Sequence, residues 1–252
     1  MNVETMTSNV FFPNRVYQFL LMVVGSMTLC SPLLFVLGDY GETPLAQMLL
    51  FCTFGAAFSM LTHFINKHKG FAIRGYYTYS LRQLALSCTI VVVILSLFAL
   101  PFSTWVSRKS SGIDDVELWI GAIVLAPLVE EWMFRGVLLR GLLTRYRPLT
   151  AVLCNAMLFS LIHVRLEQVV PALLLGILTG IVFLKTRSLL HTMLLHMLSN
   201  TLVFCSVVFQ LRESYANMNV YMRCAMMLAG LVLATLLTIH LSRKLGKYNK
   251  LQ

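Results

Sequence analysis

The sequence predicts an all-α membrane protein, a polytopic bundle of about eight transmembrane helices. Its composition is the first reason: 58% of the 252 residues are hydrophobic and 12% are charged, whereas a soluble domain carries about 25% charged residues. The second reason is a series of apolar stretches that approach or reach the roughly 20 residues a helix needs to cross a bilayer. The third is that most charged residues lie between those stretches.

The apolar stretches follow one another with short connections that leave no room for a soluble domain. The fifth and sixth are the shortest. We therefore predict a single transmembrane domain over residues 1–252, with helices at Val16–Leu37, Ala46–Ile65, Leu81–Phe102, Leu118–Leu139, Leu149–Val164, Val169–Leu184, Leu189–Phe209 and Tyr221–Leu241.

The charges between the helices predict the orientation of the bundle. Acidic residues gather in the loops after the odd-numbered helices, and basic residues gather in the alternate loops and in the tail. Because basic loops stay in the cytoplasm, both termini are predicted to be cytoplasmic. The compact form of the chain favours a bacterial plasma membrane as its location. The basic residues that carry this prediction are Lys67, Lys69, Arg74, Arg82, Arg140, Arg145, Arg147, Lys185, Arg187, Arg243, Lys244, Lys247 and Lys250.

The same asymmetry accounts for the formal net charge of +10, so the charge does not predict nucleic-acid binding. The six cysteines are scattered and form no CxxC pair, which predicts small packing residues instead of a disulfide framework or a zinc knuckle.

The fourth helix carries the most informative residues, Glu130, Glu131 and Arg135. An ionisable side chain at the centre of a membrane helix costs about 2.5–3.5 kcal/mol on insertion scales, so a cluster of three indicates a functional site. Glu131 and Arg135 are four residues apart, which predicts an ion pair on one helix face. Glu130 lies about 100° around an ideal helix from Glu131.

Further polar residues lie on the fifth and seventh helices. His163 is near the end of the fifth, and His196 and Asn200 share one face of the seventh. At 1.5 Å per residue, the glutamates lie about 12–14 Å from the cytoplasmic end, His196 and Asn200 about 11–17 Å, and His163 nearer 20 Å. We therefore expect Glu130, Glu131, His163, His196 and Asn200 to meet at one level. A carboxylate, imidazoles and a carboxamide are suited to activating water and stabilising an oxyanion.

Three motifs on separate helices give the sequence a specific resemblance. The chain resembles the CPBP family of intramembrane proteases, the CAAX proteases and bacteriocin-processing enzymes also called the Abi family. The resemblance covers about residues 118–209, the predicted catalytic core. Its motifs are Glu-Glu-x₃-Arg at Glu130, Glu131 and Arg135, Phe-x₃-His at Phe159 and His163, and His-x₃-Asn at His196 and Asn200.

The resemblance implies eight helices around a conical cavity and an endopeptidase activity. One branch of the family removes the last three residues of prenylated CAAX proteins. The implied roles are that Glu130 and His163 activate water, while His196 and Asn200 stabilise the tetrahedral oxyanion. Glu131 and Arg135 would shape and orient the site.

The cofactor question stays open between two alternatives. No cofactor is needed if Glu130 and His163 polarise water directly, and the nearby Arg135 disfavours a cation. Zinc is the alternative, since carboxylates and histidines are among its ligands. The His-Glu-x-x-His pattern of many zinc proteases is absent from the sequence.

Two other functions compete with proteolysis. A proton-coupled transporter would use Glu130, Glu131 and His163 as a relay, although the sequence has no visible inverted repeat. A catalytically silent scaffold or immunity protein of the same family would tolerate degraded motifs, whereas all the motif positions here are intact. His191 matches no motif and is predicted to bond between helices, and Gly176 and Gly180 predict close helix packing.

The expected partners are the lipid bilayer and a membrane-bound protein or peptide substrate. That substrate is either a prenylated protein or, in a bacterial cell, a pheromone precursor, a bacteriocin precursor or the tail of a membrane protein. No nucleic-acid partner is expected.

Overall fold

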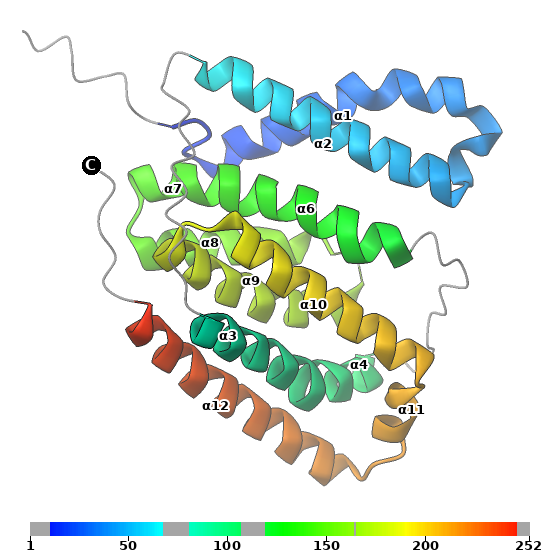
Figure 1. The fold of residues 1–252 in the computed structure, drawn as a ribbon. Helices are drawn as coiled ribbons and strands as arrows, with labels where there is room; N and C mark the ends of the chain where they lie inside the picture. The colour runs from blue at the N-terminus through cyan, green and yellow to red at the C-terminus, as the bar shows by residue number, and fades with distance from the viewer. Residues whose placement is uncertain (1–10, 68–80, 107–118, 164, 246–252) are drawn as a thin grey trace, which may run out of the picture. The chain divides into compact units, whose positions relative to one another are not determined.

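The computed structural model of the chain describes residues 11–67, 81–106, 119–163 and 165–245. Every regular element in these ranges is helical, which confirms the predicted all-α class (Figure 1). The chain divides into two compact units: unit 1 holds residues 1–74 and 115–151, and unit 2 holds residues 75–114 and 152–252. The remaining segments lie outside the described residues, including part of the charge pattern that predicts the orientation, for example Lys69, Asp114 and Lys247.

In unit 1, α1 (Val16–Leu37) and α2 (Pro44–Asn66) form an antiparallel hairpin (Figure 1). The connecting 3₁₀ turn begins at Gly38, whose φ of 49° is accessible to glycine without a Cβ clash. Thr43 then caps α2, because its Oγ1 accepts a hydrogen bond from the Ala46 N–H at 3.3 Å. Pro44 occupies the first turn, where its missing N–H has no helical partner to lose.

The fourth predicted helix is an unbroken helical run from Trp119 to Arg145. Two segments are π-helical, Gly121–Leu125 and Trp132–Leu139, with α6 (Ala126–Glu131) between them and α7 (Arg140–Arg145) after the second. The hairpin packs closely on this run: a Cβ on Gly55 of α2 would lie 3.0 Å from the Val129 side chain. The Phe19 ring of α1 lies 5.4 Å from the Phe134 ring, centroid to centroid.

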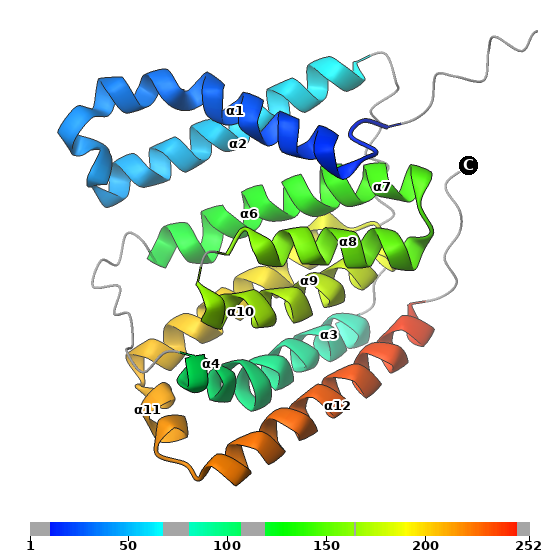
Figure 2. The same cartoon turned by 180° about the vertical axis from the view of Figure 1, so that it is seen from behind.

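Unit 2 contains the remaining helices. In chain order they are α3 (Leu81–Val93), the π-helical segment Ile94–Ala99, α4 (Leu100–Val106), most of α8 (Pro148–Leu161), α9 (Leu166–Thr186), α10 (Leu189–Val208), α11 (Leu211–Ala216) and α12 (Val220–Lys244). Figure 2 shows α12 lying along α3 and α4.

The core of unit 2 is formed by branched side chains from four helices, with Ile90 of α3, Leu178 and Val182 of α9, and Leu195 of α10 all at most 1% exposed. Leu241 of α12 completes it. Lipid tails are as apolar as leucine, so close packing holds membrane helices together more than the hydrophobic effect does.

All eight predicted helices are present as helices, and α1 has the predicted bounds. Six helices among the described residues are long and apolar enough to cross a membrane. The predicted count of eight spans therefore stays a prediction. The run 119–145 carries five ionisable residues, namely Glu130, Glu131, Arg135, Arg140 and Arg145. Helix α8, with 14 residues, is about 21 Å long against a hydrocarbon core of about 30 Å. The short helix α11 was predicted as a loop.

Candidate active site

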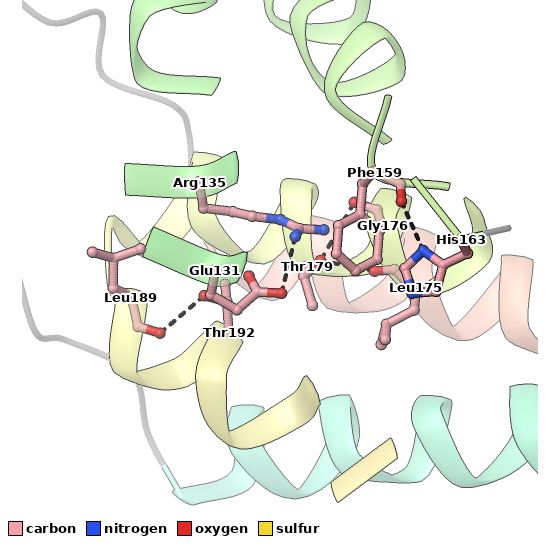
Figure 3. Close-up of polar contacts among 9 residues, drawn as sticks. All are labelled: Glu131, Arg135, Phe159, His163, Leu175, Gly176, Thr179, Leu189 and Thr192. Carbon is pink, nitrogen blue, oxygen red and sulfur yellow. Dashed lines mark hydrogen bonds and ion pairs between the residues drawn. The ribbon is translucent and has the colours of Figure 1, made fainter. Parts of the chain in front are cut away.

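The first motif lies where α6 passes into the second π-helical segment. Glu130 and Glu131 are the last two residues of α6, and Arg135 follows in the π-helical segment. Arg135 Nη1 donates a hydrogen bond to Glu131 Oε1 at 2.9 Å, with both side chains 0% exposed (Figure 3). The predicted ion pair is therefore confirmed. Removing either partner would take a 2.9 Å charge contact from a fully buried ion, which is strongly destabilising.

Glu130 differs from its neighbour in being only half-buried. The π-helical segment begins at Trp132, directly after the pair of glutamates. Such segments occur often at functional sites and change the angle between successive residues. The angles of an ideal α-helix therefore do not apply from Trp132 to Leu139, a difference that hydropathy does not reveal.

His163 lies beyond a helix end, which corrects the prediction of a fifth span reaching Val164. Helix α8 ends at Leu161, and the His163 N–H bonds to the Ser160 carbonyl at 3.2 Å in a tightened last turn. The imidazole turns back to the helix, with Nδ1 lying 2.9 Å from the Phe159 carbonyl oxygen (Figure 3). The side chain thus satisfies one of the carbonyls that a helix end leaves without a partner.

This contact fixes the tautomer of His163. A carbonyl oxygen only accepts hydrogen bonds, so Nδ1 must carry the proton and donate it. In the neutral ring, Nε2 then holds the lone pair. A histidine oriented by its Nδ1–H, with Nε2 as acceptor, has the arrangement that general-base chemistry requires.

Phe159 brings the second and third motifs together within unit 2. Its ring is 0% exposed and lies 5.2 Å from the His163 ring and 5.5 Å from the His196 ring, centroid to centroid. Both pairs are close to perpendicular, at 65° and 83°. One phenyl ring therefore forms a shared wall for two imidazoles from different helices.

His196 and Asn200 are on α10, which is a regular helix from Leu189 to Val208. His196 is 3% exposed and Asn200 is half-buried. Their spacing places them on the same face, as predicted. One further histidine of this helix, His191, is 0% exposed, and its backbone N–H bonds to the Ser188 Oγ at 3.2 Å. Its complete burial has no signal in the sequence.

Gly176 and Gly180 of α9 pack against α8, which confirms the predicted role of the pair. A Cβ on Gly180 would lie 3.0 Å from Val152 Cγ1. A Cβ on Gly176 would lie 3.1 Å from Ala156 Cα and 3.3 Å from Phe159 Cδ1. These contacts let the two helices approach closely behind Phe159.

The candidate residues are divided between the units: the first motif belongs to unit 1, and the second and third belong to unit 2. Their meeting at one level stays a prediction. Within each unit, the described residues contain no group of three or more histidine, cysteine, aspartate or glutamate side chains placed to hold a metal ion.

The chain resembles known proteins over its middle part. Residues 113–202 match the family described as type II CAAX prenyl endopeptidase, Rce1-like. An uncharacterized 24.3 kDa protein of Escherichia coli is 31% identical over 113 residues, which cover 43% of this chain and 52% of that protein. The chain thus spans about half the length of that relative. No solved structure matches the chain significantly. Through residues 113–202, the segment that holds all three motifs, this chain matches the Rce1-like family of CAAX proteases, and the resemblance predicted from those motifs is confirmed.

Proposed function

We propose that this protein is an intramembrane endopeptidase that hydrolyses a peptide bond of a membrane-associated or lipid-modified protein or peptide. The observation that carries the proposal is the arrangement at Phe159, which holds two imidazoles and leaves the Nε2 lone pair of His163 as an acceptor. The family match over residues 113–202 supports the same reaction.

In the proposed reaction, Glu130 removes a proton from water while His163 Nε2 accepts a hydrogen bond from the other water hydrogen. The water oxygen attacks the scissile carbonyl carbon, and the resulting oxyanion accepts hydrogen bonds from His196 and the Asn200 amide. Glu130 then returns its proton to the leaving amine as the C–N bond breaks. The products are a carboxylate and an amine.

The buried Glu131–Arg135 pair has a positioning role in this proposal. Because the pair is on the same helical run as Glu130 and makes a 2.9 Å contact, it fixes the π-helical segment that follows the base. The proposal needs no metal, because the Glu130 carboxylate can deprotonate the water and the His163 imidazole can orient it. These are the two tasks that a bound zinc ion would otherwise perform.

The test is a comparison of peptides and membrane proteins from cells that carry wild type or Glu130→Gln. Glutamine keeps the shape but removes the base, so a precursor should accumulate and its cleaved product should fall by about 10²–10⁴-fold. Glu213→Gln, at an exposed glutamate of α11, is the control and should cleave normally. Normal processing by Glu130→Gln, with the variant present in the membrane at wild-type amount, would reject the assignment of the base.

The same comparison bears on the substrate class, which we propose to be a peptide precursor or a membrane-protein tail if the cell makes no prenylated proteins. The identity of the accumulated precursor then separates a lipid-modified substrate from an unmodified one. Unchanged profiles for Glu130→Gln, His163→Gln and Asn200→Ala together would favour the silent scaffold or the transporter.

A further inference from the structure

The shared wall of the two imidazoles rests on helix α9. Phe159 is fully buried, and its ring contacts His163 (Figure 3). The same ring contacts His196, and its Cδ1 faces Gly176. A Cβ on Gly176 would approach that Cδ1 to 3.3 Å and the Ala156 Cα to 3.1 Å, distances that require the ring or the α8 backbone to shift.

Helix α9 carries an additional hydrogen bond within its own backbone turn at this point. The Thr179 hydroxyl, 0% exposed, donates to the Leu175 carbonyl at 2.8 Å and lies 3.4 Å from the Gly176 carbonyl (Figure 3). Leu178 and Val182 of the same helix pack with Ile90 of α3 and Leu195 of α10, and this packing resists a movement of α9 away from α8. The displacement that a Cβ causes should pass instead to the Phe159 ring and from it to both imidazoles.

We infer that Gly176 is a positioning residue for the reaction, which acts through Phe159 to set the orientation of His163 and His196. The inference rests on the proposed function and names a residue outside the three motifs. Catalysis depends on orientation so strongly that a misplacement of about 1 Å can cost about 10²-fold in rate. A single methyl group on α9 should therefore reduce turnover without touching the substrate.

The chain offers a matched control in Gly180. Both glycines lie on α9 at the α8 interface, and each substitution adds one methyl group. A Cβ on Gly180, however, would contact only the Val152 side chain, with 3.0 Å to Cγ1. Gly176→Ala and Gly180→Ala thus each add one tight contact with α8, and of the two only Gly176→Ala presses on the Phe159 ring and on the Ala156 backbone.

The first measurement is steady-state cleavage of the precursor by the purified full-length protein. We expect Gly176→Ala to lower kcat by about 10–100-fold with KM nearly unchanged, and Gly180→Ala to stay within about threefold of wild type. Equal losses for the two variants, or normal turnover by Gly176→Ala, would overturn the inference.

The second measurement follows the imidazoles themselves, by NMR of protein with labelled histidine, with His163 and His196 assigned from His163→Gln and His196→Gln. Both rings lie against the Phe159 ring, so their signals should move in Gly176→Ala and stay in place in Gly180→Ala. This readout does not need activity. If wild type cleaves nothing, the proposed function fails, while moved signals would still support the positioning role and unmoved signals would reject it.

A double-mutant cycle covers the case in which Gly176→Ala folds poorly. Leucine at position 159 has no ring for the added methyl group to displace, so Gly176→Ala/Phe159→Leu keeps only the contact with Ala156. If Gly176 acts through Phe159, this double variant should be as active as Phe159→Leu alone. A further large loss on adding Gly176→Ala would show that the glycine acts by another route.

Discussion

At the scale of single residues, the proposed site depends on groups whose hydrogen-bonding roles are fixed by their neighbours. His163 is the best example, because the Phe159 carbonyl oxygen requires its Nδ1 to be protonated. A motif gives the position of such a histidine. Only the contact with the carbonyl oxygen shows which ring nitrogen remains a hydrogen-bond acceptor.

Asn200→Ala tests the oxyanion role. If the carboxamide donates to the oxyanion in the transition state alone, kcat should fall by about 10²–10³-fold and KM should change little. The measurement is steady-state cleavage by purified protein, with Asn217→Ala at an exposed asparagine as the control. An effect on KM alone would assign Asn200 to substrate binding.

The Glu131–Arg135 pair makes a prediction about stability. Glu131→Gln or Arg135→Met should each destabilise the protein by about 3–5 kcal/mol, because the remaining buried charge loses its 2.9 Å partner. The double variant should lose much less free energy of unfolding than the sum of the losses in the two single variants. Unfolding in detergent measures all three, and additive losses would contradict a coupled pair.

At the scale of elements, close backbone approaches decide how segments pack. In unit 1 the segment before α1 crosses α7 at Gly141, where a Cβ would clash with the Pro13 carbonyl oxygen. Asn66 holds the same segment, accepting from the Phe12 N–H at 3.0 Å and donating to its carbonyl at 2.8 Å. The Arg140 guanidinium lies 4.9 Å from the Phe11 ring centroid.

Gly141→Ala should therefore displace this segment and destabilise the protein by about 1–3 kcal/mol, as overpacking does. Gly121→Ala is the control, because its Cβ would meet the flexible Met48 side chain, 3.3 Å from Cγ. Alanine favours a helix by about 1 kcal/mol over glycine at either position. The difference in stability between the two variants therefore measures the clash alone. Equal melting temperatures for both variants in detergent would contradict it.

In unit 2 a hydrogen bond joins two helices: Arg212 of α11 donates to the Ser103 carbonyl of α4 at 2.8 Å. Burial lowers the pKa of Arg212, and the nearby Glu167 carboxylate opposes that shift. The contact joins α11 to α4 within unit 2. It fixes the position of the short helix that stands where the sequence predicts a loop between two spans.

At the scale of the whole molecule, the helices identify an integral membrane protein, and the charge pattern predicts its orientation. Reporter fusions after position 252 should remain in the cytoplasm, whereas fusions in the Gly38–Glu42 turn should report from the opposite side. An external C-terminus, or both fusions on one side, would reject the orientation and the even number of spans.

The metal question also belongs to the whole protein. We expect active, purified enzyme to contain much less than one zinc per chain and to keep its activity after chelation, because Glu130 and His163 suffice for the proposed chemistry. Elemental analysis of that preparation decides the matter. Near-stoichiometric zinc, with activity lost to a chelator and restored by Zn²⁺ alone, would make these residues ligands.

The sequence alone determined the helical class, the positions of the helices and the family match. A segment in lipid must satisfy its backbone hydrogen bonds internally, so a long apolar run has little choice but to be helical. This is why α1 runs from Val16 to Leu37 as predicted. The Glu131–Arg135 pair was predictable for a similar reason, since both partners lie on one local face.

Only the tertiary structure decided the features that depend on distant residues. The end of α8 at Leu161, the tautomer of His163 and the placement of Phe159 against His196 and Gly176 all arise from contacts at this helix end or between helices. The π-helical segment at Trp132–Leu139 likewise has no hydropathy signal. Side-chain packing sets these features, and hydropathy and motif spacing record only which residues are available to pack.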